Sequence, residues 1–342
     1  MKKKYLVILA ILVVILASMG IYFRSRSGAY DVNEEKKVVV NIPSGSTTDS
    51  IADKLKAEKL IKNKLVFKIN VKISGKAAQF KAGDYQFDTS YTNQEIIDDI
   101  AAGKIYHSGP KITVKEGATS LEVINELVKK NLGTKENYEK LINNPDEFRG
   151  RYEFLKDKNI KSLEGFLYPS TYFCSEGESE REVISRMLNK FDEIYKAKIK
   201  PEMKKNNELD LYDVMKMASI VEKEAVLDED RPLIASVFYN RLAKDMLLQS
   251  DATVQYAFEE RKKVVSYNDL KVESPYNSYK YKGLPPTPIA NPSWKSIDAA
   301  INPADTEYLY FVAKTDGGGN NYAKTYEEHL KYEKQYKEQR EK

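Results

Sequence analysis

The sequence begins with an apolar run that is unsuited to the core of an ordinary soluble domain. The segment Tyr5 to Phe23 (YLVILAILVVILASMGIYF) contains no charged side chain. As a helix it is long enough to cross the hydrocarbon core of a bilayer, which is about 30 Å thick. The sequence therefore predicts a single transmembrane helix over residues 5–23.

Charges beside this run predict its orientation. Three lysines occupy positions 2–4, and the positive-inside tendency makes residues 1–4 a short cytoplasmic tail. Arg24 and Arg26 on the other flank argue weakly the other way. The alternative is a cleaved signal peptide, but the run exceeds the usual length and Ser18-Met19-Gly20 lies too deep for cleavage. We therefore expect a single-pass protein of the cell membrane, with its large C-terminal part extracellular or periplasmic.

Composition limits the chemistry of the remaining chain. With 31% charged and 42% hydrophobic residues, it has enough apolar material for about two or three domains. A net charge of +4 does not indicate nucleic-acid binding, and one cysteine, Cys174, excludes an internal disulfide. His107 and His329 are the only histidines and show no metal-ligand spacing. We expect no metal and no cofactor, which leaves carboxylates as the candidate catalytic acids.

The first folded segment is expected after a polar linker over residues 24–36. A strand starts at Lys37 (KVVVNIP), followed by a helix capped by Thr48 or Asp49. Residues 65–73 and 83–87 are predicted to be strands, and residues 92–102 a helix capped by Thr92. The sequence therefore predicts a small α+β module over residues 37–108.

The same order of strand, turn and helix recurs in Lys111 to Leu132 (KITVKEGATSLEVINELVKKNL), with the turn at Glu116-Gly117. This weak repeat predicts a second α+β subdomain over residues 109–160. Residues 161–342 then form a larger mixed α+β domain. Within it, Gly317 to Gly319 is predicted to be a hairpin tip, and Tyr322 to Lys342 a charged terminal helix.

One aromatic segment and one helix carry candidate carboxylates. Glu164 lies in LEGFLYPSTY, where aromatic rings beside an acid suit a carbohydrate, although core packing of these rings is the alternative. Glu222 and Glu224 lie in a helix predicted from Leu211 to Ala225. Because they are two residues apart, they are separated by about 200° and at most one points into a given cleft. The pattern favours neither, and a solvated face is the alternative.

Six motifs in fixed order then make the sequence resemble a known family. They are ASIVEKEA, ASVFYNRL, LQSDATVQYA, SPYNSY, GLPPTPIANP and YLYFVAK. Together they resemble the endolytic murein transglycosylase family, the MltG or YceG-like proteins. The first module also resembles a LysM-type glycan-binding domain through IPSGSTTDSIADKL and KAGDYQF, which implies one or more small LysM-like α+β modules before the catalytic domain.

The resemblance implies endolytic, non-hydrolytic cleavage of the bond between N-acetylmuramic acid and N-acetylglucosamine in peptidoglycan. Its catalytic glutamate belongs to SIVEKEA, which assigns the role to Glu224, with Glu222 as second candidate. This residue would protonate the leaving oxygen and then act as base while the sugar's own C6 hydroxyl attacks, giving a 1,6-anhydro end. A muramidase-type hydrolase with Asp251 as second carboxylate, and a non-catalytic glycan-binding or scaffold protein, are the alternatives.

The resemblance also suggests substrate-binding residues and partners. Gln249 and Asp251 are expected beside the cleft, although Asp251 could instead cap a helix over residues 252–258. Asn277 and Tyr279 are expected sugar contacts. Arg241 is expected to pair with an acid, and the proline-rich segment 285–292 to form a loop at the edge of the groove. Expected partners are peptidoglycan strands, the membrane and cell-wall synthases of elongation or division.

Overall fold

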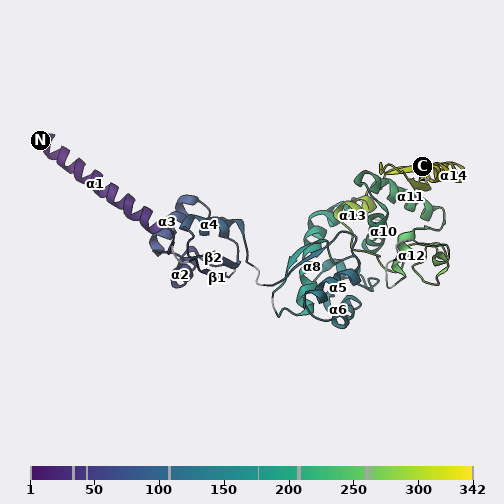
Figure 1. Cartoon of the computed structure of the whole chain (residues 1–342), viewed down its shortest axis with the longest axis horizontal. Helices are drawn as coiled ribbons and strands as arrows, with labels where there is room; N and C mark the ends of the chain where they lie inside the picture. Colours follow the sequence, from purple (N-terminus) through teal and green to yellow (C-terminus); the bar gives the residue numbers. More distant parts are fainter. Residues whose placement is uncertain are drawn as a thin grey trace. The chain divides into compact units, whose positions relative to one another are not determined.

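The computed structural model describes residues 2–32, 35–43, 45–106, 109–175, 177–205, 209–258, 262 and 265–340. The chain divides into two compact units, Met1–Ser108 and Gly109–Lys342 (Figure 1). Each unit has its own cluster of buried apolar side chains. Both units contain helices and short antiparallel strand pairs, so the mixed α+β class is confirmed.

Unit 1 starts with the long helix α1, Lys2–Ser27. The helix is longer than the apolar run, so Arg24 and Arg26 of the expected linker lie in its last turn. Its segment Ala10–Ser27 has a mean hydropathy of 1.4 and none of it is buried. In length and composition, this helix is suited to span a membrane.

In the described residues, the rest of unit 1 is a small module of two strands and three α-helices (Figure 1). The antiparallel pair is set in register by Val40 opposite Tyr85. Apolar side chains from both strands and all three helices form the core, in which Phe67 and Phe87 are completely buried. The elements are β1 (Lys37–Ile42), α2 (Thr48–Ala57), α3 (Lys64–Ser74), a 3-10 turn (Ala77–Gln79), β2 (Gly83–Asp88) and α4 (Asn93–Ala102).

The predicted strand over residues 65–73 is wrong, because this segment is α3. Asn63 caps its first turn by accepting from the Val66 amide, and Gly75 ends it in the left-handed conformation. The cap of α2 is also displaced: Thr47 accepts from the Ser50 amide, rather than Thr48 or Asp49 capping the helix. The strands at 37 and 83 and the helix capped by Thr92 are confirmed.

Unit 2 is mainly helical, and its described residues contain two further antiparallel pairs. The strand and helix predicted in residues 111–132 are confirmed as β3 and α5. β3 (Lys111–Val114) pairs with β4 (Ser170–Phe173), and β5 (Tyr310–Ala313) pairs with β6 (Asn320–Ala323). The helices are α5 (Ser120–Lys129), α6 (Lys135–Ile142), α7 (Asp146–Arg149), α8 (Glu180–Ile194), α9 (Lys200–Met203), α10 (Leu211–Glu224), α11 (Arg231–Ala243), α12 (Asp251–Tyr256), α13 (Trp294–Ile301) and α14 (Tyr326–Arg340). A π-helical turn (Tyr195–Ile199) joins α8 to α9, and 3-10 turns occupy Glu153–Leu155, Asp228–Asp230 and Asp269–Lys271.

The centre of unit 2 is formed by α10, which packs against α13 and α11. The aromatic segment predicted beside a sugar instead contributes to this core, since Phe166 and Leu167 are completely buried. The proline-rich segment forms a loop, as predicted; it is buried over residues 287–293, and Ile289 within it lines a cavity. These two segments meet closely, because a Cβ on Gly165 would lie 2.7 Å from the Pro288 ring.

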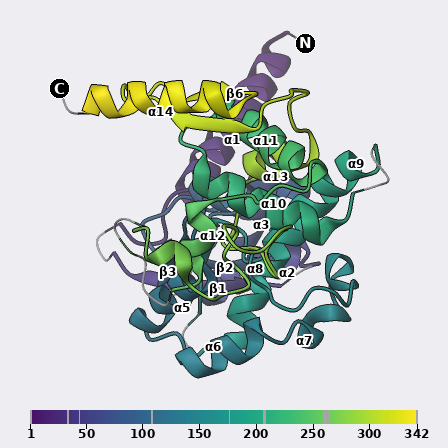
Figure 2. The same ribbon diagram turned by 90° about the vertical axis from the view of Figure 1, so that its right-hand side faces the viewer.

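The C-terminal hairpin and helix lie together at one end of unit 2. The run Gly317 to Gly319 forms the turn between β5 and β6, as predicted. Helix α14 lies beside this hairpin (Figure 2) and has no buried side chain. It begins at Tyr326, four residues later than predicted, because Tyr322 belongs to β6.

Candidate active site

Helix α10 carries both candidate glutamates into the middle of unit 2. Asp210 caps its start by accepting from the Asp213 amide, and its apolar face, including Met217 and Val221, is fully buried. The helix ends at Glu224, because Ala225 adopts an extended conformation. Both glutamates therefore lie in the final turn, on different sides of the helix.

Glu222 has structural partners on two sides. Its Oε2 atom accepts from the Ser293 amide (2.9 Å) and the Ser293 hydroxyl (2.6 Å), at the start of α13. The Arg231 guanidinium lies 3.3 Å from the same oxygen, and the Glu222 side chain is only 6% exposed. Glu222 therefore fastens α10 to α13 and α11.

Glu224 faces a different surface, the start of α12. Its Oε1 atom accepts from the Ser250 hydroxyl at 2.5 Å, and the Ala252 amide also hydrogen-bonds to the carboxylate. As whole residues both glutamates are of intermediate exposure, so it is their partners that differ. The structure thus distinguishes the two glutamates, which the helical pattern alone did not.

The surroundings of Glu224 favour its neutral form. Loss of hydration raises the pKa of this carboxyl above its usual range, and the negative charge of Asp251 raises it further. The hydrogen bonds from Ser250 and Ala252 act in the opposite direction. A carboxylic acid that keeps its proton to higher pH is the group that general acid catalysis requires.

Asp251 and Tyr279 lie beside Glu224. The Tyr279 hydroxyl donates to Oδ1 of Asp251 at 2.7 Å. Burial raises the pKa of Tyr279, and the charges of Asp251 and Glu224 add to the effect. Asp251 is the first residue of α12 and Ser250 is its N-cap, so the alternative in which Asp251 caps this helix is wrong.

Gln249 and Asn277 have different places in the loops around this group. Gln249 is exposed, has a left-handed backbone (φ 54°), and its Oε1 accepts from the Arg241 guanidinium at 3.1 Å. Asn277 is completely buried, and its amide donates to the carbonyls of Leu270 and Val272, both at 2.9 Å. The side chain of Asn277 therefore holds its own loop together.

Within the described part of the chain Arg241 forms no ion pair with an acid, contrary to prediction. Its guanidinium donates to the carbonyl oxygens of Leu309 (2.6 Å), Leu248 (2.9 Å) and Leu247 (3.1 Å), as well as to Gln249. It fixes the segment that leads into Ser250 and Asp251. Desolvation of this buried cation lowers its pKa.

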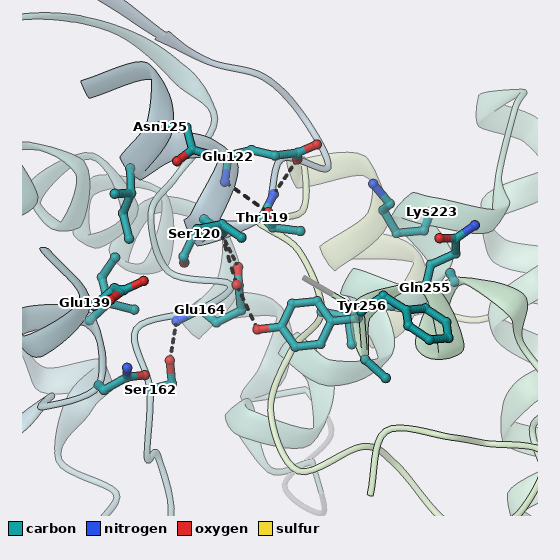
Figure 3. A pocket seen from close by; sticks show the side chains of 18 residues that line it. Thr119, Ser120, Glu122, Asn125, Glu139, Ser162, Glu164, Lys223, Gln255 and Tyr256 are labelled. Atoms are coloured by element: carbon teal, nitrogen blue, oxygen red, sulfur yellow. Dashed lines mark hydrogen bonds between the residues drawn. The ribbon is translucent and has the colours of Figure 1, made fainter. Parts of the chain in front are cut away.

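A cavity of about 570 Å³ adjoins this group, within the size range of ligand pockets. Its wall includes Lys223, which directly precedes Glu224, and Ala252, whose amide hydrogen-bonds to the Glu224 carboxyl. Figure 3 shows Lys223, Gln255 and Tyr256 across the cavity from the start of α5. The lining is Thr119, Ser120, Leu121, Glu122, Ile124, Asn125, Glu139, Ile142, Asn143, Ser162, Glu164, Lys223, Ala252, Gln255, Tyr256, Ala257, Phe258 and Ile289.

Glu164 lies in the floor of this cavity and joins its two sides (Figure 3). Its carboxylate accepts from the Ser120 amide at the start of α5 (3.0 Å) and from the Tyr256 hydroxyl at the end of α12 (3.0 Å). Only 3% of Glu164 is exposed, and this burial raises its pKa to about 7. Glu164 therefore holds α5 and α12 in place. It lines the same cavity as Lys223 and Ala252, the neighbours of Glu224.

Two residues that the sequence interpretation did not single out are central to this geometry. Ser250 contacts Glu224, and its amide is held by the Ser278 hydroxyl at 2.9 Å. Tyr256 links α12 to Glu164. Ser250 belongs to the motif LQSDATVQYA. A serine directly before a helix whose first residue is acidic indicates an N-cap. Among the described residues, no three histidine, cysteine or acidic side chains gather as metal ligands.

Comparison with known proteins gives consistent results along most of the chain. An endolytic murein transglycosylase of Bacillus subtilis is 38% identical over 94% of this chain and 91% of its own length. One of Streptococcus pneumoniae is 32% identical over 87% of this chain, which spans 58% of that longer relative. The crystal structure of a putative yceG-like protein from Listeria monocytogenes is 37% identical, with a TM-score of 0.60, covering 87% of this chain and all of that one.

The family profile gives the same result. The profile of the YceG-like family matches residues 40–335, which include most of both units. The six ordered motifs and the α10 glutamates lie within the matched range. The chain belongs to the YceG-like family, whose curated relatives are the endolytic murein transglycosylases.

Proposed function

We propose that this protein is a membrane-anchored endolytic murein transglycosylase in which Glu224 is the only acid–base catalyst. The observation that carries the assignment is the environment of Glu224. Its carboxyl is desolvated, has a raised pKa and lies next to Lys223 and Ala252 in the wall of a cavity of ligand size. The relatives named endolytic murein transglycosylase support peptidoglycan as the substrate.

The reaction needs one proton donor and no water. Protonated Glu224 gives its proton to the glycosidic oxygen as the bond to C1 of N-acetylmuramic acid breaks. The C6 hydroxyl of the same sugar then attacks C1, and its proton passes to the Glu224 carboxylate. The products are a 1,6-anhydro end and a free N-acetylglucosamine hydroxyl, and Glu224 is again protonated. Attack from within the same sugar benefits from proximity, so no second carboxylate has to act as nucleophile.

Residues around Glu224 have supporting roles in this proposal. Asp251, held by Tyr279, and the exposed Gln249 are available to bind hydroxyl or acetamido groups of the sugar. Glu164 positions α5 and α12 on the two sides of the cavity. Asn277 acts through the loop that carries Tyr279, since its Oδ1 accepts from the Tyr279 amide at 3.0 Å.

The proposed location rests on α1. Its apolar segment is suited to a membrane span, and lysines at positions 2–4 favour a cytoplasmic N-terminus. The catalytic unit then lies outside the cytoplasm, where peptidoglycan is. Glycan binding by the LysM-like module, and partnership with synthases of elongation or division, belong to the same proposal and rest on the resemblance alone.

Product analysis tests the reaction type. Purified glycan strands are incubated with the full-length protein in vesicles, and the soluble products are identified by mass spectrometry. We expect 1,6-anhydro ends from the start of the reaction, in fragments of internal origin. Reducing ends instead would identify a hydrolase, for which Asp251 is the obvious second carboxylate. Absence of cleavage would favour a glycan-binding or scaffold protein.

A further inference from the structure

Helix α3 carries an apolar stripe that the core of its module does not cover. Leu65, Ile69 and Ile73 are 65%, 37% and 74% exposed, and they follow one another at intervals of four residues. Residues spaced in this way share one face of a helix. The buried face of α3 is formed by Val66, Phe67 and Val71. The three exposed side chains therefore form a separate surface.

A row of lysines borders this stripe. Lys64, Lys68 and Lys72 are exposed and lie beside it on the helix, which has no acidic residue. Lys64 and Lys68 form ion pairs with Asp53 and Asp49 of α2. An apolar stripe beside a basic row is the pattern of a helix that lies at the surface of an anionic membrane.

The position of α3 relative to α1 indicates that a membrane covers this apolar stripe. The Ser27 hydroxyl, in the last turn of α1, donates to Oδ1 of Asn70 on α3 at 3.4 Å. Figure 1 shows α3 as the module helix at the end of α1. Asn70 lies on the side of α3 next to Ile69 and Ile73, so the stripe adjoins the contact with α1.

Simple dimensions place this contact at the level of the lipid headgroups. Four residues separate Phe23, the end of the apolar run, from Ser27, which is about 6 Å of helix. Each headgroup layer is about 5–7 Å thick, from a total of about 40–45 Å around a core of about 30 Å. Tyr22 stacks with the Arg26 guanidinium at 5.6 Å, an aromatic and a cation suited to the membrane surface.

We propose that Leu65, Ile69 and Ile73 of α3 form a membrane-contact surface, seated in the headgroup region of an anionic bilayer beside the exit of α1. Lys72 faces the anionic headgroups, and Lys64 and Lys68, paired with Asp53 and Asp49, border the stripe on the same side. The inference rests on the proposed membrane anchor. Its consequence is that the first module is held against the membrane instead of moving freely on a tether.

Depth-dependent quenching tests this surface in the full-length protein. An environment-sensitive fluorophore is attached through Ile73→Cys or Leu65→Cys, and the protein is placed in vesicles with bromine near the top of the acyl chains. Native Cys174 is fully buried, and burial raises its pKa to about 11, so it provides no competing label. The unmutated protein checks this directly.

The matched control is Asn41→Cys, an exposed position on β1. β1 starts at Lys37, near the contact between Asp31 and Thr89 that follows α1, and Asn41 lies four residues, about 13 Å, farther along the strand. We expect quenching at positions 65 and 73 to exceed that at 41 by about threefold or more, and to be stronger with phosphatidylglycerol than with phosphatidylcholine alone.

Flotation of the same vesicles at alkaline pH separates the two proposals. If the protein floats but quenching is equal at positions 41 and 73, the membrane-contact surface is overturned and the anchor stands. The apolar stripe would then be covered by a partner protein. Protein that does not float overturns the anchor and this inference with it. Quenching that is independent of phosphatidylglycerol overturns the role given to the lysines.

Discussion

At the scale of single residues, two glutamates of one helical turn have separate tasks. Glu222 is bound by Ser293 and Arg231, whereas Glu224 accepts hydrogen bonds from Ser250 and Ala252. The sequence showed that they point in different directions, because of their spacing. It did not show which neighbour each meets, since Ser250 and Ser293 are 26 and 71 residues away along the chain.

Removing the Ser250 hydroxyl should change the pH dependence of the reaction. The hydrogen bond from Ser250 lowers the pKa of Glu224, so Ser250→Ala should raise that pKa further. A net hydrogen-bond contribution of about 1 kcal/mol corresponds to a shift of about 0.7 pH units. Activity depends on the protonated acid and is lost as pH rises through its pKa. The alkaline limb of the kcat/KM profile should therefore move to higher pH, and an unchanged limb would contradict the role of Glu224.

Glu164 should make the stability of unit 2 depend on pH. Its pKa of about 7 in the folded protein is above the ordinary value of 4.5, so the folded state holds this proton more tightly. The corresponding stability is present below about pH 4.5 and is lost as pH rises through about 7, by about 3 kcal/mol in total. Glu164→Gln should remove this dependence. Urea unfolding at pH 5 and pH 8 measures it, and an equal pH effect in both proteins would refute the assignment.

At the scale of elements, helices and strands with a clear local sequence signal were predicted correctly. Thr92, with its capping box, marked α4 correctly, and alternating apolar residues marked β1 and β3. Residues 65–73 alternate in the same way but form α3, because Phe67 and Val71 pack into the core at helical spacing. Ile69 and Ile73 remain outside that core, so the apolar pattern alone did not reveal which face was buried.

The close packing of the segment around Glu164 depends on one glycine. Gly165 has a φ of +89°, and an added Cβ would lie 2.7 Å from Pro288. Gly165→Ala should therefore destabilise unit 2 by about 2 kcal/mol or more, through backbone strain and displacement of the loop. Gly150→Ala is the matched control, since Gly150 has a φ of −66° and open space around it. Thermal unfolding measures both, and equal melting temperatures would contradict the close approach seen here.

At the scale of the whole molecule, the two units have separate buried clusters. The class and the order of the elements were largely predictable, because caps and strand patterns are local signals. The cavity was not predictable, because it is formed by α5, α6 and α12, whose neighbourhood depends on long-range contacts such as Tyr256 to Glu164. Asn277 shows the same limit, since its motif suggested a sugar contact while its amide is used within its own loop.

Separate cores imply separate effects on stability. Phe67 is completely buried in the module, and Phe67→Ala should lower the stability of unit 1 by about 3–5 kcal/mol. The initial rate of glycan cleavage, measured below the new unfolding transition, should stay near that of the unmutated protein. On heating, we expect the near-ultraviolet circular dichroism of this variant to fall in an early step, because unit 1 unfolds first. Glycan-cleaving activity should be retained through that step. Unfolding of the whole chain in a single step would contradict independent cores.

Substitution of each glutamate by glutamine separates the proposed acid, Glu224, from the structural residue, Glu222. Both proteins are assayed in vesicles for 1,6-anhydro products by mass spectrometry, with thermal unfolding measured in parallel. Glu224→Gln should lower the rate by about 10²- to 10⁴-fold with little change in melting temperature. Glu222→Gln should lower stability by about 1–3 kcal/mol, through its bonds to Ser293 and Arg231, and retain cleavage while folded. Full activity in Glu224→Gln, or loss of activity in a folded Glu222→Gln, would contradict the account.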